Sequence, residues 1–194
     1  MTPDPIIFAG VELSSGRKPV VFAALDGDLN IKMQETWDIS DTLLCLQEYE
    51  EIALAIDVPA SKSGQKVHTE LTEKLALAGF SPFSPKRHSK HWLETNAQDS
   101  FRTLSGHSLL PRRSLEGRLQ RCAILYEQGL QIADPVDMFE EITRFKLVQG
   151  ILPLENLPSP NGLDALVAAY LAWMSANRPA RTVPQGVFVL PAGE

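Results

Sequence analysis

The sequence contains few of the residues that would indicate disulfide bonds, cysteine metal sites or membrane insertion. Only two of the 194 residues are cysteines, Cys45 and Cys122, and each lies inside a helical pattern. Two isolated thiols fit buried apolar side chains in a reducing compartment better than a metal site. No apolar run approaches the roughly 18 residues of a membrane span. The first five residues also lack the basic stretch of a signal peptide. We therefore expect a cytoplasmic protein with no membrane partner.

Bulk composition is that of an ordinary globular protein. Hydrophobic residues make up 44% of the chain and charged residues 22%, values typical of a folded domain. A chain of 194 residues fits one domain better than two, and it can bury a sizeable core. We expect residues 1–194 to form a single domain.

Charge is distributed unevenly along the chain, whose net charge is −6. Residues 86–121 hold eight of the 18 lysines and arginines but only three of the 24 acids, so they carry +5 and the remainder −11. The eight are Lys86, Arg87, Lys90, Arg102, Arg112, Arg113, Arg118 and Arg121. A local basic patch can hold a phosphate backbone. The alternative is a solvated surface that balances acidic neighbours, and the sequence does not choose between them.

The first third of the chain predicts a three-stranded meander followed by a crossover. Strands are expected at 6–13, 19–25 and 30–37, separated by short turns. A helix capped by Ser40 or Asp41 follows, and then an apolar strand at 51–58. Because a helix separates the third and fourth strands, the fourth can run parallel to the first.

The rest of the chain is mostly helical in pattern. Residues 80–112 have weak periodicity and are expected to form a connector, which with the next helix makes a basic loop and helix insertion around 80–129. Residues 149–162 are expected to be a loop and 130–133 a short strand. Helices are expected at 65–79, 113–129, 137–148 and from Asn161 or Gly162 to about Ala176, with a final edge strand at 186–190. The expected fold is an α/β mixed sheet flanked by helices.

Two carboxylates end neighbouring strands of this expected sheet. Glu12 follows the apolar run IIFAGV, and Asp57 follows IALAI. A carboxylate in such surroundings is costly unless it is paired, hydrogen-bonded or metal-bound. Ligands of open α/β sheets bind at the carboxyl ends of strands. Both residues are therefore metal-ligand candidates. The alternative is a pair of carboxylates that accept hydrogen bonds from nearby backbone amides.

A third carboxylate, Asp164, lies in the first turn of the last expected helix. A structural interpretation is available for it, because an acid there complements the helix dipole. Asn161 as N-cap with Asp164 three residues later also loosely matches a capping box.

Several short motifs occur in an order that resembles a known family. They are GVEL at 10–13, AIDVPAS at 55–61, ADPVDMF at 133–139, GLDALVAAYLAW at 162–173 and GVFVLPAGE at 186–194. With the order of elements, they resemble the ribonuclease H-like superfamily. More narrowly, they resemble the predicted ribonuclease H-like nucleases of domain-of-unknown-function family 429.

The resemblance implies a ribonuclease H-like sheet and a metal-dependent nuclease with a two-metal mechanism. Glu12, Asp57 and Asp164 would be catalytic ligands of Mg²⁺ or Mn²⁺. A fourth acid would come from the first helix and its end, where the candidates are Glu48, Glu50 and Glu51. Glu12 departs from the family's usual Asp, and its extra methylene bears on activity because Mg²⁺ demands near-ideal octahedral geometry.

Nucleic acid, DNA or RNA, would be the partner. Arg112 and Arg113 are the first candidates to bind its phosphates, and Lys62 and Lys66 the second; the alternative for these lysines is a solvent-facing charge. A rival interpretation keeps the fold without catalysis, as a scaffold that binds nucleic acid or a protein partner. The sequence does not determine the oligomeric state and leaves a homodimer open.

Overall fold

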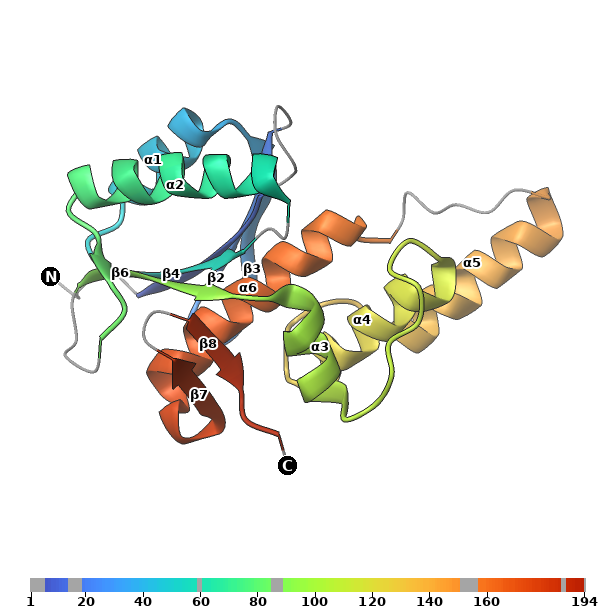
Figure 1. Cartoon of the computed structure of the whole chain (residues 1–194). Helices are drawn as coiled ribbons and strands as arrows, with labels where there is room; N and C mark the ends of the chain where they lie inside the picture. The colour runs from blue at the N-terminus through green and yellow to red at the C-terminus, as the bar shows by residue number, and fades with distance from the viewer. Residues whose placement is uncertain are drawn as a thin grey trace, which may run out of the picture.

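The protein is an α/β structure built on one mixed sheet (Figure 1). The computed structural model describes residues 6–13, 19–58, 61–84, 89–150, 157–185 and 188–193. The strand order is β3-β2-β1-β4-β6-β8-β7, with β5 paired to β6. The strands are β1 (Ile7–Glu12), β2 (Val20–Leu25), β3 (Ile31–Trp37), β4 (Ile52–Asp57), β5 (Ser81–Pro82), β6 (Lys90–Thr95), β7 (Thr182–Gln185) and β8 (Phe188–Pro191).

The predicted opening of the fold is confirmed. β1 pairs antiparallel with β2, and β2 pairs antiparallel with β3. β4 lies parallel to β1 on its other side. β1 and β2 are buried along their whole length, because helices cover both faces of the sheet at its centre. β3 has only half-buried and exposed positions, as expected for a strand at the edge of the sheet.

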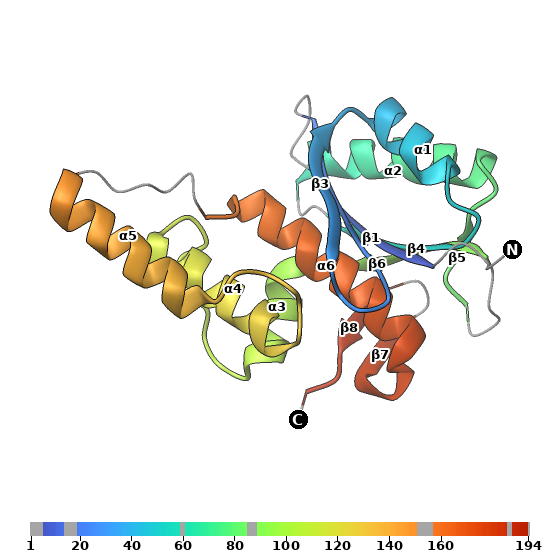
Figure 2. The same cartoon turned by 180° about the vertical axis from the view of Figure 1, so that it is seen from behind.

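Helices cover the sheet in two layers. α1 (Ile39–Gln47) and α2 (Lys62–Leu77) lie over one face, and α6 (Pro160–Asn177) lies over the other (Figures 1 and 2). The predicted cap of the first helix was wrong by a few residues. Asp38, rather than Ser40 or Asp41, accepts a hydrogen bond from the Asp41 amide at 2.8 Å.

Small residues allow α6 to lie directly against the sheet. Gly10 faces the helix, and a Cβ atom at that position would lie 2.0 Å from the carbonyl oxygen of Ala165 and 2.3 Å from the amide nitrogen of Ala169. Ala168 lies in the same contact. This close approach determines how far the first turn of α6 is from the ends of β1 and β4.

The segment expected to be a basic loop and helix insertion was predicted wrongly in part. β6 lies inside the sheet, parallel to β4, and α3 (Ala97–Ser105) follows it before α4 (Leu115–Glu127). The sequence of β6, KHWLET, lacks the alternation of apolar and polar residues that marks a half-exposed strand. The reason is that Trp92 and Leu93 are buried on opposite faces of the sheet. Neighbouring polar residues made the segment resemble a loop.

The C-terminal third extends the molecule. α5 (Pro135–Gln149) follows α4 and points away from the sheet (Figures 1 and 2). Residues 130–133 contain one isolated bridge, Gln131 to Asn30, rather than a strand. β8 is not the edge strand that was expected, because β7 pairs with its outer side. Within the described residues, no helix combines the length and apolarity needed to cross a membrane.

Candidate functional site

Glu12 and Asp57 are direct neighbours at the carboxyl ends of adjacent parallel strands. They are Cα partners in the β1–β4 register. Since side chains alternate along a strand, both point to the face that Gly10 and Ala55 turn toward α6. Glu12 is only 8% exposed. The sequence prediction that these two acids share one edge of the sheet is confirmed.

Asp164 lies in the buried first turn of α6, which packs on the same face. The residue is 3% exposed. The predicted capping box was wrong, since Ser159 caps the helix and its Oγ accepts from the Gly162 amide at 3.0 Å. The carboxylate of Asp164 therefore takes no part in the helix cap and makes a different contact.

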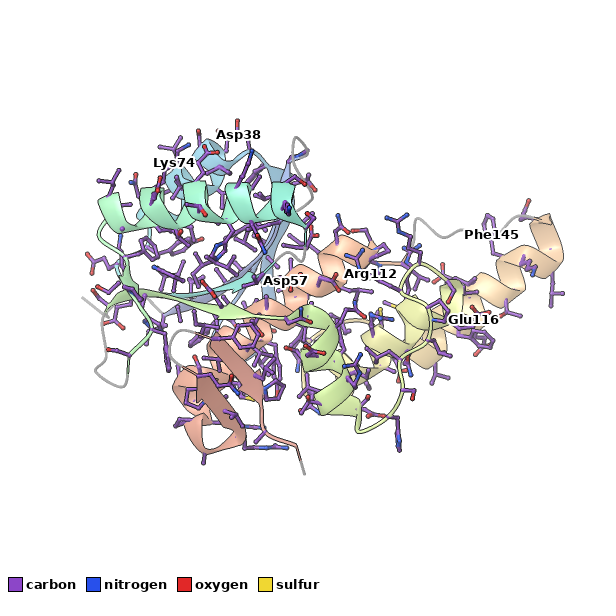
Figure 3. All side chains as sticks on the ribbon, in the orientation of Figure 1. Asp38, Asp57, Lys74, Arg112, Glu116 and Phe145 are labelled. Carbon is purple, nitrogen blue, oxygen red and sulfur yellow. The ribbon has the colours of Figure 1, made fainter. Side chains whose placement is uncertain are left out.

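That contact is an ion pair with Arg112, which comes from the loop before α4 (Figure 3). Arg112 Nε donates to Asp164 Oδ2 at 2.7 Å, and Nη2 contacts the same oxygen. Nη2 also donates to Asn161 Oδ1 at 2.7 Å. About a quarter of the Arg112 side chain (26%) remains exposed. A guanidinium therefore already neutralises part of the acidic cluster.

The loop that carries Arg112 is held tightly. The Pro111 carbonyl accepts hydrogen bonds from the Ser114 amide and hydroxyl, each at 3.0 Å. Ser114 Oγ in turn accepts from the Gly117 amide at 3.0 Å. A Cβ on Gly117 would lie 1.9 Å from the Pro111 oxygen. Arg112 is thus presented by a rigid turn.

A second arginine, Arg121, was missed as a site residue by the sequence reasoning. It is 1% exposed and donates to Gly117 O at 2.8 Å and Gln98 Oε1 at 2.9 Å. Its charge lowers the pKa of Asp164. The sequence did contain one indication that Arg121 is buried. Arg118 and Arg121 lie on the same face of the helix as Leu125, where a solvent-facing arginine is not expected.

Two acids of this cluster, Asp57 and Asp164, have raised pKa values, chiefly because they are buried. The pKa of Asp57 is raised to about 7, chiefly by burial; the Ala97 amide, at 2.8 Å from Oδ1, opposes the rise, Asp164 and Glu12 add to it, and Arg112 opposes it. Burial also raises the pKa of Asp164, while Arg112 and then Arg121 lower it. Three carboxylates in one partly dry space repel one another, so this edge of the sheet favours positive charge.

The donor chemistry fits a hard divalent cation, which prefers carboxylate oxygens. Among the described residues, however, no three His, Cys, Asp or Glu side chains are arranged as a ready metal site. Arg112 holds Oδ2 of Asp164. Oδ1 of Asp164 is buried and has no hydrogen-bond partner within the described part of the chain. A metal ion would therefore need a shift of these side chains or of Arg112.

The predicted fourth acid was wrong for all three candidates. Glu48 caps the C-terminal end of α1. Glu50 and Glu51 directly precede β4, and the Glu51 carbonyl accepts from the Ile7 amide where β1 begins. The site lies at the carboxyl ends of β1 and β4, whereas these acids lie near the amino ends of the same strands.

The basic segment is only partly a surface. Arg118 and Arg121 are buried, Arg112 pairs with Asp164, and Arg102 pairs with Asp99 at 2.8 Å. Lys86 and Arg87 lie outside the described residues. Arg113 is exposed. The net charge of the segment therefore overstates the positive surface that it offers to a phosphate.

Lys62 and Lys66 are exposed on α2, which covers the other face of the sheet. They are not part of the carboxylate cluster, and a role for them in binding nucleic acid stays a prediction.

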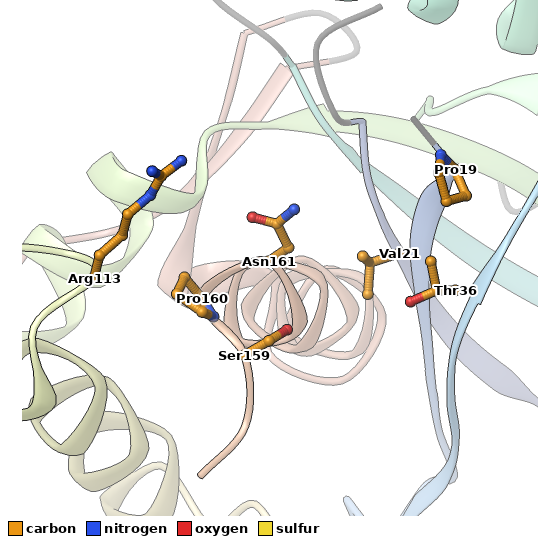
Figure 4. Close-up of a pocket in the computed structure, with 7 residues that line it drawn as sticks. All are labelled: Pro19, Val21, Thr36, Arg113, Ser159, Pro160 and Asn161. Carbon is orange, nitrogen blue, oxygen red and sulfur yellow. The ribbon is translucent and has the colours of Figure 1, made fainter. Parts of the chain in front are cut away.

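A cleft of about 500 Å³ opens beside the N-terminal end of α6 (Figure 4). Arg113 and Asn161 lie on its α-helical side, and Val21 and Thr36 on the side of the sheet. Asn161 also contacts Arg112, so the cleft borders the acidic cluster. Glu12 is the strand partner of Val21.

Comparison with known proteins does not assign the chain to a family. No protein-family model matches the sequence, and no curated protein matches it significantly.

Proposed function

We propose that this protein is a metal-dependent nuclease with a ribonuclease H-like fold. The observation that carries the proposal is the pairing of Glu12 with Asp57 at the ends of β1 and β4, on the face covered by the buried Asp164. The mixed sheet is compatible with that fold, and the resemblance to family 429 in the sequence motifs supports it.

Glu12, Asp57 and Asp164 would hold Mg²⁺ or Mn²⁺ through their carboxylates. The bound ions, two in the mechanism that the resemblance implies, would supply an activated water and stabilise the leaving oxygen of a phosphodiester. Before an ion binds, the raised pKa of Asp57 keeps this carboxyl group partly protonated near neutral pH. Ion binding requires the deprotonated form, so it is coupled to the loss of that proton.

Arg112 would act as the resident counter-ion of the cluster. Its Nε and Nη2 are aimed at Asp164 and Asn161, while the exposed part of its side chain faces outward. Guanidinium groups match phosphate oxygens in geometry. We therefore propose that Arg112 passes from Asp164 to a substrate phosphate when an ion takes over the neutralisation of the carboxylate.

The cleft beside α6 would receive the nucleic-acid strand. It borders the cluster through Asn161, and the exposed Arg113 adds a cation to its wall. Whether the strand is DNA or RNA is not determined by these contacts, because phosphate contacts carry no base identity.

The experiment is a cleavage assay with single-stranded and structured DNA and RNA, in Mn²⁺, Mg²⁺ or EDTA. We expect cleavage that requires the metal and is lost in Asp57→Asn. The matched control is Glu48→Gln, which removes an acid at the opposite edge of the sheet and should cleave like the wild type. Metal-independent cleavage, or equal cleavage by Asp57→Asn, would show that this site is not the catalytic one.

A second candidate function is favoured by one observation, the ion pair between Arg112 and Asp164. If that pair is permanent, the fold is a scaffold that binds nucleic acid or a protein without catalysis. Filter binding of the same nucleic acids separates the two functions. The scaffold predicts binding that is unaffected by EDTA, with no cleavage in any metal.

A further inference from the structure

α5 exposes an unusual amount of apolar surface for a helix of this size. Val136 is 70% exposed, Phe139 52% and Leu147 81%. Only Pro135 and Ile142 of this helix are buried. Figures 1 and 2 both show the helix projecting away from the sheet, and the described residues leave these side chains exposed. Contiguous exposed apolar residues of this kind mark interaction surfaces.

The helix is well defined at both ends. Asp134 caps it and accepts a hydrogen bond from the Val136 amide at 2.8 Å, and Pro135 occupies the first turn. Gly150 ends it with φ of 70° and donates its amide to Lys146 O. Proline at the start and a left-handed glycine at the end are strong helix boundaries. The exposed residues therefore belong to a fixed surface.

Three of the five exposed apolar side chains of α5, Val136, Phe139 and Leu147, form a stripe with the half-buried Thr143. Val136, Phe139, Thr143 and Leu147 follow one another at intervals of three, four and four residues. At 100° per residue these four positions lie within about 80° of the helix circumference. A stripe of this width along about three turns suits packing against one other helix. Phe145 and Val148 are also exposed but lie well outside it.

The charges of α5 indicate what that other helix is. Asp137, Glu140 and Glu141 lie in its N-terminal half, and Arg144 and Lys146 lie in its C-terminal half. We propose that the stripe binds the same stripe of a second copy of this chain, with the two α5 helices antiparallel. This arrangement places each acidic half against a basic half, whereas a parallel pair would place like charges together.

A twofold axis passing near Thr143 makes the contact self-complementary. It sets Phe139 of one copy opposite Leu147 of the other, and Glu140 close to Arg144. Isologous contacts of this kind close after two copies, so the expected product is a dimer. The proposal is independent of the nuclease proposal, because no residue of the stripe belongs to the carboxylate cluster.

Sedimentation-velocity ultracentrifugation of the full chain tests the proposal. We expect a dimer at micromolar concentrations, and a monomer for Leu147→Glu, which buries a charge in the contact. The matched control is Val148→Glu, the same change at an exposed apolar residue outside the stripe, which should remain dimeric. Both side chains are exposed in the single chain, so circular dichroism should show unaltered folding.

Charge exchange tests the antiparallel orientation. Glu140→Arg should weaken the dimer by at least tenfold in its dissociation constant, because Arg144 of the other copy then faces a like charge. The double variant Glu140→Arg/Arg144→Glu should restore it. A monomeric wild type, a dimer that Leu147→Glu leaves intact, or failure of the double variant to restore binding would overturn the proposal.

Discussion

Arg112 donates a 2.7 Å hydrogen bond to a carboxylate oxygen of Asp164 that is almost wholly buried. The two residues are far apart in sequence, and they meet where the loop before α4 reaches the first turn of α6. This pair decides the electrostatic state of the cluster in the absence of a metal ion.

Arg112→Gln leaves the buried carboxylate of Asp164 without its ion-pair partner. Breaking a buried pair from one side costs about 3–5 kcal/mol, so we expect a loss of that order in the free energy of unfolding, measured with urea near neutral pH. The exposed neighbouring arginine provides the control: Arg113→Gln should change stability by less than about 0.5 kcal/mol. Equal losses in the two variants would show that the ion pair does not stabilise the fold.

The second prediction extends this variant to metal binding. With Arg112 gone, Mn²⁺ becomes the cation that can neutralise Asp164. Added Mn²⁺ should therefore raise the melting temperature of Arg112→Gln more than that of the wild type, by the linkage between binding and stability. A smaller rise in the variant would argue that Arg112 does not compete with the metal ion.

The pKa of Asp57 predicts a pH dependence of stability. Its folded value of about 7 lies above the ordinary 3.8, so between these pH values the folded state keeps a proton that the unfolded state has released. Stability contributed by this group is present at low pH and is lost as the pH rises toward 7, by up to about 1.4 kcal/mol per pH unit. Asp57→Asn should lack this slope. It should therefore gain stability relative to the wild type between about pH 4 and pH 8 in urea titrations. A constant difference would contradict the raised pKa.

Gly10→Ala tests the packing that sets the distance between the sheet and Asp164. The new Cβ would meet the backbone atoms of Ala165 and Ala169 at 2.0 and 2.3 Å. Backbone cannot move aside cheaply, so we expect a loss of about 3 kcal/mol or more in stability, at the upper end of overpacking effects. Gly27→Ala is the control, since its Cβ would meet nothing within 4 Å and should cost little. The free energies of unfolding compare the two.

Much of the sheet could be predicted from the sequence, because its apolar runs are long and its turns are strong. β1, β2, β3 and β4 were expected in the observed order and pairing. β6 was not, since Lys90 and Glu94 hide a strand that is buried at Trp92 and Leu93. Local pattern cannot show that a polar-looking segment lies in the middle of a sheet.

The site was predictable only where position along a strand decides it. Glu12 and Asp57 end apolar strands, so the expected parallel pairing of these strands predicts that the two residues lie side by side. The ion pair of Arg112 with Asp164 depends on where the loop before α4 lies in the folded chain. The spacing of residues along the sequence does not predict that position. The fourth-acid candidates failed for a similar reason, because the direction of α1 places its C-terminal end far from Asp57.

Calorimetric titration of Mn²⁺ into the wild type and Asp57→Asn tests the central claim most directly. We predict that the wild type binds Mn²⁺ and releases protons, seen as a heat that depends on the ionisation enthalpy of the buffer, and that Asp57→Asn shows no such binding. A wild type that binds no Mn²⁺, or an Asp57→Asn variant that binds it equally well, would contradict a metal site at Glu12, Asp57 and Asp164.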